Sequence, residues 1–150
     1  MPVSGRASLL ARLSAPPDGC AGIGAARVNG KELYDRAVAI SKRAYAPYSN
    51  YLVGAAVQTR DGKVFEGVNV ENAAYPLGVC AEKSALVKAV SEGYRPGDFA
   101  AIGITASPCG GCRQWLYEFG LEEITFLSSK DELVTYSAAD LLPDTWDLPT

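Results

Sequence analysis

Three cysteines and one glutamate have the residue types and the spacing of a metal site. Cys109 and Cys112 are three positions apart, so they share one face if their segment is helical. Cys80 and Glu82 lie together upstream, where a second helical pattern begins. If the two helix starts meet, three sulfurs converge on one ion and Glu82 lies beside it. Thiolate ligands favour zinc, and three protein ligands leave the fourth tetrahedral position open to water, as in catalytic zinc sites.

The downstream cysteine pair alone is ambiguous. Pro108-Cys109-Gly110-Gly111-Cys112 fits a redox dithiol as well as a metal site, and the upstream Cys80-Ala81-Glu82 favours the metal. The chain has no histidine, so cysteine and carboxylate must supply the ligands and the general base. Cys20 is interpreted as a free thiol. Its alternative role, as a fourth sulfur that closes a structural four-cysteine zinc module, would leave Glu82 without a function.

The composition is that of one globular domain acting on a small molecule. The 150 residues are 48% hydrophobic and 21% charged, with a net charge of −3 at pH 7. This balance provides no basic surface for a nucleic acid polymer and favours a small uncharged or cationic substrate. No apolar run approaches the roughly 18 residues of a membrane span. With four cysteines and no recognisable secretory leader, we expect a cytoplasmic protein without a membrane partner.

The chain divides into two parts. Residues 1–28 are rich in serine, alanine, glycine and proline, and we expect a flexible or loosely docked N-terminal extension. An alternative interpretation of this segment is a transit peptide. Residues 29–150 carry every chemical motif and are predicted to form the catalytic domain.

Alternating helix and strand patterns must position the site residues. Helices are expected at 31–45, 80–91, 109–119 and 138–142, and strands at 53–59, 64–70, 100–106, 124–127 and 133–136. Pro47 is expected to end the first helix, and Asp61-Gly62 to turn the first two strands into a hairpin. A hairpin followed by alternating helix and strand predicts an α/β fold, with a mixed five-stranded sheet between helices on both faces.

Six motifs follow the order of a known family. They are AYAPYS (44–49), VGAA (53–56), GVNVENAAY (67–75), CAE (80–82), SPCGGCRQ (107–114) and LLP (141–143). From about Lys31 to Trp146, the chain therefore resembles the homotetrameric zinc-dependent cytidine deaminases. The resemblance implies a three-layer α/β/α sandwich and Zn²⁺ as cofactor. It also implies hydrolytic deamination of cytidine and 2′-deoxycytidine to uridine and 2′-deoxyuridine in pyrimidine salvage, by a homotetramer with shared active sites.

The same resemblance implies roles for the catalytic centre. Cys80, Cys109 and Cys112 would hold the zinc. Glu82 would take a proton from zinc-activated water and pass it to the ring nitrogen and then to the leaving amine. The backbone of Ala81 would donate to the pyrimidine carbonyl.

Four further positions match family residues around the nucleoside. Asn69 and Glu71 would bind the ribose 3′-hydroxyl. Tyr51 falls where the family usually has phenylalanine, lining the base pocket. Trp146 falls where the family has an aromatic residue that reaches a neighbouring subunit's site.

Three thiolates outweigh the charge of Zn²⁺, so the site needs helix N-termini and nearby cations. Lys83 and Arg113 are the candidate cations beside the zinc. The family normally has arginine at the position of Lys83. Arginine can fork to two sulfurs, whereas lysine offers a point charge.

A second substrate class shares this zinc centre. Deaminases of nucleoside antibiotics such as blasticidin S also have the Cys-Ala-Glu and Pro-Cys-x-x-Cys motifs. The stretch from Asn69 to Tyr75 favours the cytidine enzymes over that alternative.

Overall fold

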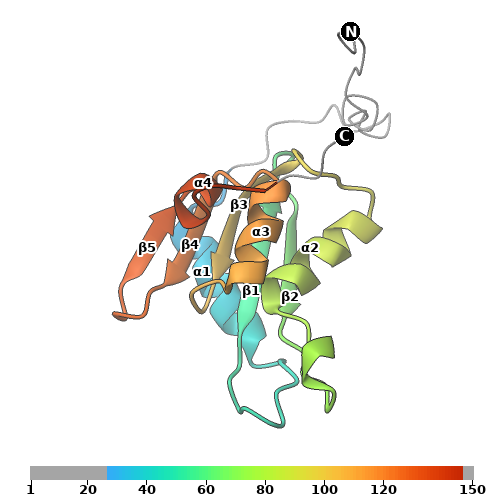
Figure 1. The fold of residues 1–150 in the computed structure, drawn as a ribbon. Helices are drawn as coiled ribbons and strands as arrows, with labels where there is room; N and C mark the ends of the chain where they lie inside the picture. The colour runs from blue at the N-terminus through green and yellow to red at the C-terminus, as the bar shows by residue number, and fades with distance from the viewer. Residues whose placement is uncertain (1–26, 147–150) are drawn as a thin grey trace, which may run out of the picture.

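A mixed five-stranded sheet forms the middle layer of the computed structural model, which describes residues 27–146 (Figure 1). Its strand order is β2-β1-β3-β4-β5. Within this sheet, β3 and β4 pair in parallel, and the other neighbouring strands are antiparallel. The strands are β1 (Gly54–Thr59), β2 (Val64–Val68), β3 (Phe99–Ile104), β4 (Glu123–Leu127) and β5 (Leu133–Tyr136).

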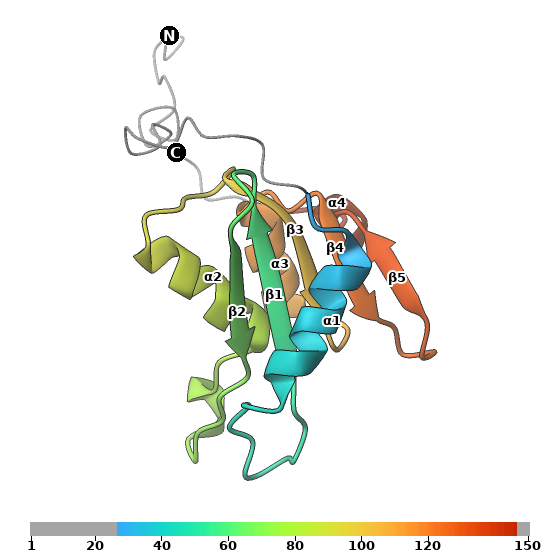
Figure 2. The same ribbon diagram turned by 180° about the vertical axis from the view of Figure 1, so that it is seen from behind.

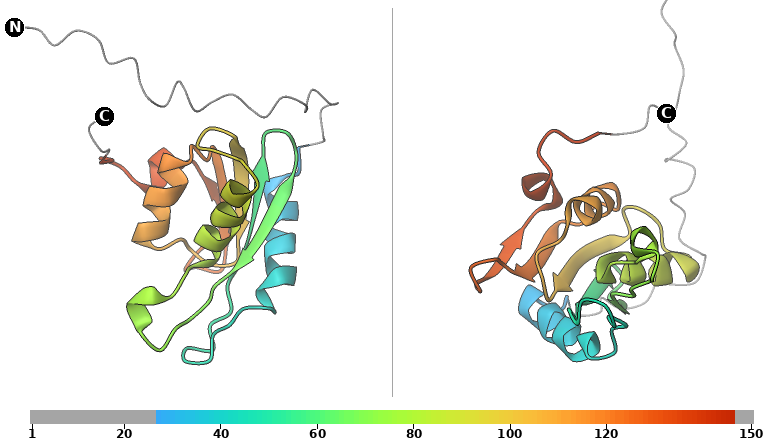
Figure 3. Two further views of the ribbon diagram at one scale, coloured as in Figure 1. Left: turned by 90° about the vertical axis from the view of Figure 1, so that its right-hand side faces the viewer. Right: turned by 60° about the horizontal axis from the view of Figure 1, so that its bottom comes forward.

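Helices cover both faces of this sheet. Helix α1 (Gly30–Ser41) packs on one face, and α2 (Ala81–Ser91) and α3 (Gly110–Glu118) lie side by side on the other (Figures 2 and 3). The short α4 (Ala138–Leu141) contacts α3, and a 3₁₀ turn, η2 (Tyr75–Leu77), precedes α2. The predicted three-layer α/β/α sandwich is therefore confirmed. No helix among residues 27–146 is long and apolar enough to cross a membrane.

The central strands are buried because helices cover them on both sides. Every residue of β1 and β3 is buried. The larger core lies between the sheet and the α2–α3 layer, and a smaller one lies under α1. Helix α2 approaches β2 closely at Gly67, where a Cβ atom would lie 2.3 Å from the backbone nitrogen of Ala85. This contact brings the start of α2, with Cys80, down onto the sheet.

The first helix ends earlier than the sequence predicts. An Asn29–Glu32 capping box begins α1 as helix-capping rules expect, but the helix ends at Ser41 rather than Tyr45. Tyr45 instead pairs with the chain after β2: its N–H donates to the Asn69 carbonyl at 3.1 Å, and its own carbonyl accepts from the Glu71 N–H at 2.8 Å. The prediction of helix over residues 42–45 was wrong because a distant segment supplies these hydrogen bonds.

Most of the predicted N-terminal extension, with Cys20, lies outside the described residues. The two described residues of that segment dock on the sheet. Arg27 forms an ion pair with Glu123 at 2.8 Å, and the Val28 N–H donates to Gln58 Oε1 at 3.1 Å.

Candidate zinc and nucleoside site

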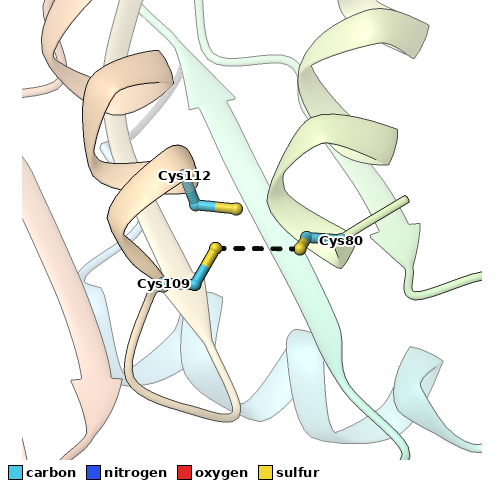
Figure 4. Close-up of side chains that lie close together, drawn as sticks. All are labelled: Cys80, Cys109 and Cys112. Atoms are coloured by element: carbon cyan, nitrogen blue, oxygen red, sulfur yellow. Dashed lines mark hydrogen bonds between the residues drawn. The ribbon is translucent and has the colours of Figure 1, made fainter. Parts of the chain in front are cut away.

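Two helix N-termini bring the three cysteines together. Cys80 is the N-cap of α2, Cys109 is the N-cap of α3, and Cys112 lies in the first turn of α3. Their side chains point toward a common centre between the two helices (Figure 4). The Cys80 and Cys109 sulfurs are 3.9 Å apart, and all three sulfurs lie within 4.8 Å of one another.

This sulfur triangle fits a zinc ion. Ligands at about 2.3 Å in a tetrahedron place neighbouring sulfurs about 3.8 Å apart, close to the separation of Cys80 and Cys109. Soft thiolates select zinc over magnesium or calcium. Each helix N-terminus also presents unpaired N–H groups and a partial positive charge toward the sulfurs. The geometry and the donor chemistry therefore agree on Zn²⁺.

The thiols and one lysine favour a thiolate at Cys80. The hydrogen bond from Cys112, with smaller contributions from Cys109 and the positive charge of Lys83, lowers the pKa of Cys80 to about 6, although burial opposes this shift. Of the two candidate cations, Lys83 thus acts electrostatically on Cys80. The guanidinium of Arg113 donates elsewhere, to the backbone carbonyls of Pro108 and Leu141.

Glu82 is a buried carboxyl beside the sulfurs. It is the second residue of α2, and only 4% of its surface is exposed. Burial, with a smaller contribution from the negative charge of Cys80, raises the pKa of Glu82 to about 7. A carboxyl that titrates near neutral pH can both accept and donate a proton there.

Four of the five predicted substrate residues line one cavity of about 400 Å³ together with two of the three candidate zinc ligands. Cys80, Glu82 and Cys109 belong to its wall, as do Tyr51, Asn69, Glu71 and Ala81. Trp146 does not line this cavity, and 66% of its surface is exposed. The structure thus brings together every predicted nucleoside residue except Trp146.

Asn69 and Glu71 also hold the loop that forms one wall of this cavity. Asn69 Oδ1 accepts from the Val53 N–H, and Asn69 Nδ2 donates to the Tyr51 carbonyl, both at 2.8 Å. Glu71 accepts from the Tyr48 N–H at 2.9 Å, from the Ser49 N–H at 3.2 Å and from the Ser49 hydroxyl. These side chains therefore fix the loop that carries Tyr51.

Ser49 is a site residue that the sequence analysis missed. It lines the cavity, and its hydrogen bond lowers the pKa of Glu71 below its usual range. The sequence placed Ser49 in the turn-rich loop before β1. That loop did not reveal its partner, Glu71, which is 22 positions away in sequence.

Known proteins match the chain over the same region. Residues 27–128 match the family model described as the cytidine and deoxycytidylate deaminase zinc-binding region. The probable cytidine deaminase of Dictyostelium discoideum is 43% identical over 107 residues, which are 67% of this chain and 71% of that protein. The cytidine deaminase of Sporosarcina psychrophila is 41% identical over 110 residues, or 68% and 79% of the two chains. The crystal structure of cytidine deaminase from Burkholderia pseudomallei covers 79% of this chain and all of its own, with 46% identity and a TM-score of 0.74.

Proposed function

The chain belongs to the cytidine and deoxycytidylate deaminase family, whose zinc-binding region it contains, and from this premise we propose that it converts cytidine and 2′-deoxycytidine to uridine and 2′-deoxyuridine. Each reaction consumes one water and releases one ammonia. The observation that carries the proposal is the buried Glu82 carboxyl beside the Cys80, Cys109 and Cys112 sulfurs, in one cavity with the predicted nucleoside residues. The confirmed family membership and zinc cofactor support the reaction class.

Glu82 performs the proton transfers of this reaction. Zinc at the three thiolates supplies Lewis-acid activation of water at neutral pH. The Glu82 carboxylate accepts the proton that the attacking water loses, and delivers it to the ring nitrogen N3. The hydroxyl that the attack has added at C4 then gives its proton through Glu82 to the amine, the C4–N4 bond breaks, and ammonia leaves as the C4 carbonyl forms. Its raised pKa suits both directions of transfer.

The cavity offers matching groups to the nucleoside. Ala81 is the first residue of α2, so its N–H lacks an intrahelical acceptor and can donate to the pyrimidine carbonyl. The Glu71 carboxylate accepts three hydrogen bonds from the loop, and a carboxylate has about four acceptor positions. One position therefore remains for the ribose 3′-hydroxyl. The Asn69 amide likewise retains a second N–H and a second lone pair beside it.

Ammonia release from cytidine, 2′-deoxycytidine and blasticidin S, with zinc content on the same sample, tests the proposal. We expect turnover of both simple nucleosides by zinc-loaded protein. Activity on blasticidin S alone would contradict the substrate assignment and leave the zinc assignment intact. Zinc-loaded protein that is inert to all three would contradict the reaction.

We also propose that this activity serves pyrimidine salvage in the cytoplasm, in a homotetramer with shared sites. Large exposed side chains near the cavity support an interface, because water is a poor environment for them. They are Tyr45, Tyr48, Tyr51, Leu52, Val70, Tyr75, Leu77 and Val79. Trp146, exposed and outside its own chain's cavity, supports a contribution to a neighbouring site.

Subunit mixing tests the shared site directly. Glu82→Gln removes the proton carrier of a site, and Trp146→Ala removes the group lent to a neighbour. Each variant alone should be nearly inactive, and refolding them together should restore activity in mixed tetramers. A monomer by sedimentation equilibrium, or full activity of Trp146→Ala alone, would refute sharing.

A further inference from the structure

Arg113 follows Cys112 in the first turn of α3, and its guanidinium joins two separate segments of backbone. Its Nε donates to the Pro108 carbonyl at 3.0 Å, and its Nη1 donates to the Leu141 carbonyl at 3.2 Å. Among the described residues, Arg113 takes part in none of the ion pairs. Its two acceptors are therefore neutral carbonyls, which it holds in fixed geometry.

The two carbonyls belong to functionally different segments. Pro108 directly precedes the zinc ligand Cys109, whereas Leu141 ends α4. The next residue of α3 makes a second connection to the same C-terminal segment, since Gln114 Nε2 donates to the Trp146 carbonyl at 3.2 Å. The first turn of α3 thus holds the ligand loop on one side and residues 138–146 on the other.

In the described part of the chain, the hydrogen bonds of Arg113 go to backbone carbonyls and not to the sulfurs. The Arg113 guanidinium is half-buried, with two of its donors on the carbonyls. Through its bond to the Pro108 carbonyl, Arg113 acts on the backbone next to Cys109.

We propose that Arg113 is a positioning residue that fixes Cys109 by holding the Pro108 carbonyl to the Leu141 carbonyl at the end of α4. This pair of hydrogen bonds, the Arg113 brace, couples the zinc ligands to the C-terminal segment. The rigid fork of arginine reaches both carbonyls at once, which a lysine ammonium on its flexible stem does not reproduce. A positive charge at position 113 is therefore insufficient, by itself, to hold both carbonyls.

Arg113→Met and Arg113→Lys test the brace, with Arg60→Met as the matched control. Arg60 makes a similar bond away from the site, from Nε to the Gly97 carbonyl at 2.8 Å. Zinc transfer from the folded, zinc-loaded proteins to a chromogenic chelator should be about 10- to 100-fold faster in both Arg113 variants, as for other groups that orient metal ligands. The control should match the unchanged protein.

Cobalt substitution gives a readout that general destabilisation does not move. The visible spectrum of Co²⁺ bound at the three sulfurs should shift in both Arg113 variants and stay unchanged in Arg60→Met. An Arg113→Lys protein with the original spectrum and zinc-transfer rate would show a role for charge and overturn the proposal. If Arg113→Met fails to fold, the lysine variant carries the same test because it retains the stem and the charge.

A measurement on the unchanged protein completes the test. Coupling between two sites is reciprocal, so zinc addition to the metal-free chain should slow hydrogen exchange in residues 138–142 as well as around Cys109. Protection confined to the ligand loop would overturn the brace. Neither this readout nor zinc transfer depends on cytidine turnover, so the failure of this inference is distinct from failure of the proposed function.

Discussion

Substitution of Gly67 by alanine should disturb both stability and catalysis, although Gly67 touches no substrate. The added Cβ would lie 2.3 Å from the Ala85 nitrogen and 2.6 Å from the Ala81 carbonyl oxygen. These two atoms are joined by a helical hydrogen bond of α2, so neither can move aside alone. Restoring ordinary contact requires a shift of the whole helix by about 1 Å.

The size of the effect follows from that shift. Overpacking of this kind costs about 1–3 kcal/mol of unfolding free energy. Cys80 and Glu82 move with the start of α2, and a displacement of about 1 Å at reacting groups costs roughly 100-fold in rate. Cys109 and Cys112 are carried by α3 and stay in place. The distances from the Cys80 sulfur to the Cys109 and Cys112 sulfurs therefore change.

Urea denaturation and steady-state kinetics on zinc-loaded protein measure the two losses. Gly110→Ala is the matched control, since its added Cβ meets no atom within 4 Å. At this first position of α3, alanine should raise the unfolding free energy by about 0.5–1 kcal/mol. A Gly67→Ala protein that keeps its stability and its turnover would refute the close packing of α2 on β2.

Three further predictions concern charge and metal. Glu82→Gln should retain zinc but lower kcat by about 10²–10⁴-fold, and near-normal turnover would remove Glu82 from the proton path. Lys83→Arg should preserve or raise kcat, because a guanidinium can fork to two sulfurs; a large loss would indicate that Lys83 has another role, such as contacting substrate. Hydrogen bonds from Ser49 lower the pKa of Glu71 in the folded chain, so ionised Glu71 stabilises the fold. This stabilisation is fully present above the pKa of Glu71 in the unfolded chain, and it is lost as the pH falls through the lower pKa of the folded chain. The Tm of Glu71→Gln should therefore lie below that of the unchanged protein at pH 7, and the gap should close as the pH falls below about 4; a gap independent of pH would contradict the ionised state of Glu71.

Local patterns predicted the elements well, and non-local pairing caused the main error. The β5 strand has the predicted bounds, and the predicted starts of α2 and α3 differ from the observed ones by one residue, because Cys80 and Cys109 are N-caps. The end of α1 was mispredicted because Tyr45 pairs with the chain around Asn69. No periodicity within the helix itself reveals that partner.

In the candidate site, too, local sequence patterns predicted some residues, whereas contacts between distant segments were not predictable. Residue type and spacing predicted the sulfur cluster, and the resemblance identified Tyr51, Asn69, Glu71 and Ala81 in the cavity beside it but not Ser49. The contacts of Arg113 were not predictable, because its second acceptor, Leu141, lies 28 positions away in sequence. The role of Asn69 and Glu71 in holding the loop likewise depends on contacts made only in the folded chain.

The separation of the zinc ligands along the chain has a consequence for the order of assembly. Cys109 and Cys112 are neighbours in sequence, whereas Cys80 lies 29 positions before Cys109. An unfolded chain can offer the downstream pair to a metal at little entropic cost, while the third sulfur arrives only when α2 has docked on β2. Metal added during refolding would therefore bind first to Cys109 and Cys112 and then to Cys80. Complete coordination of the zinc would thus report that the sheet and its helices have assembled.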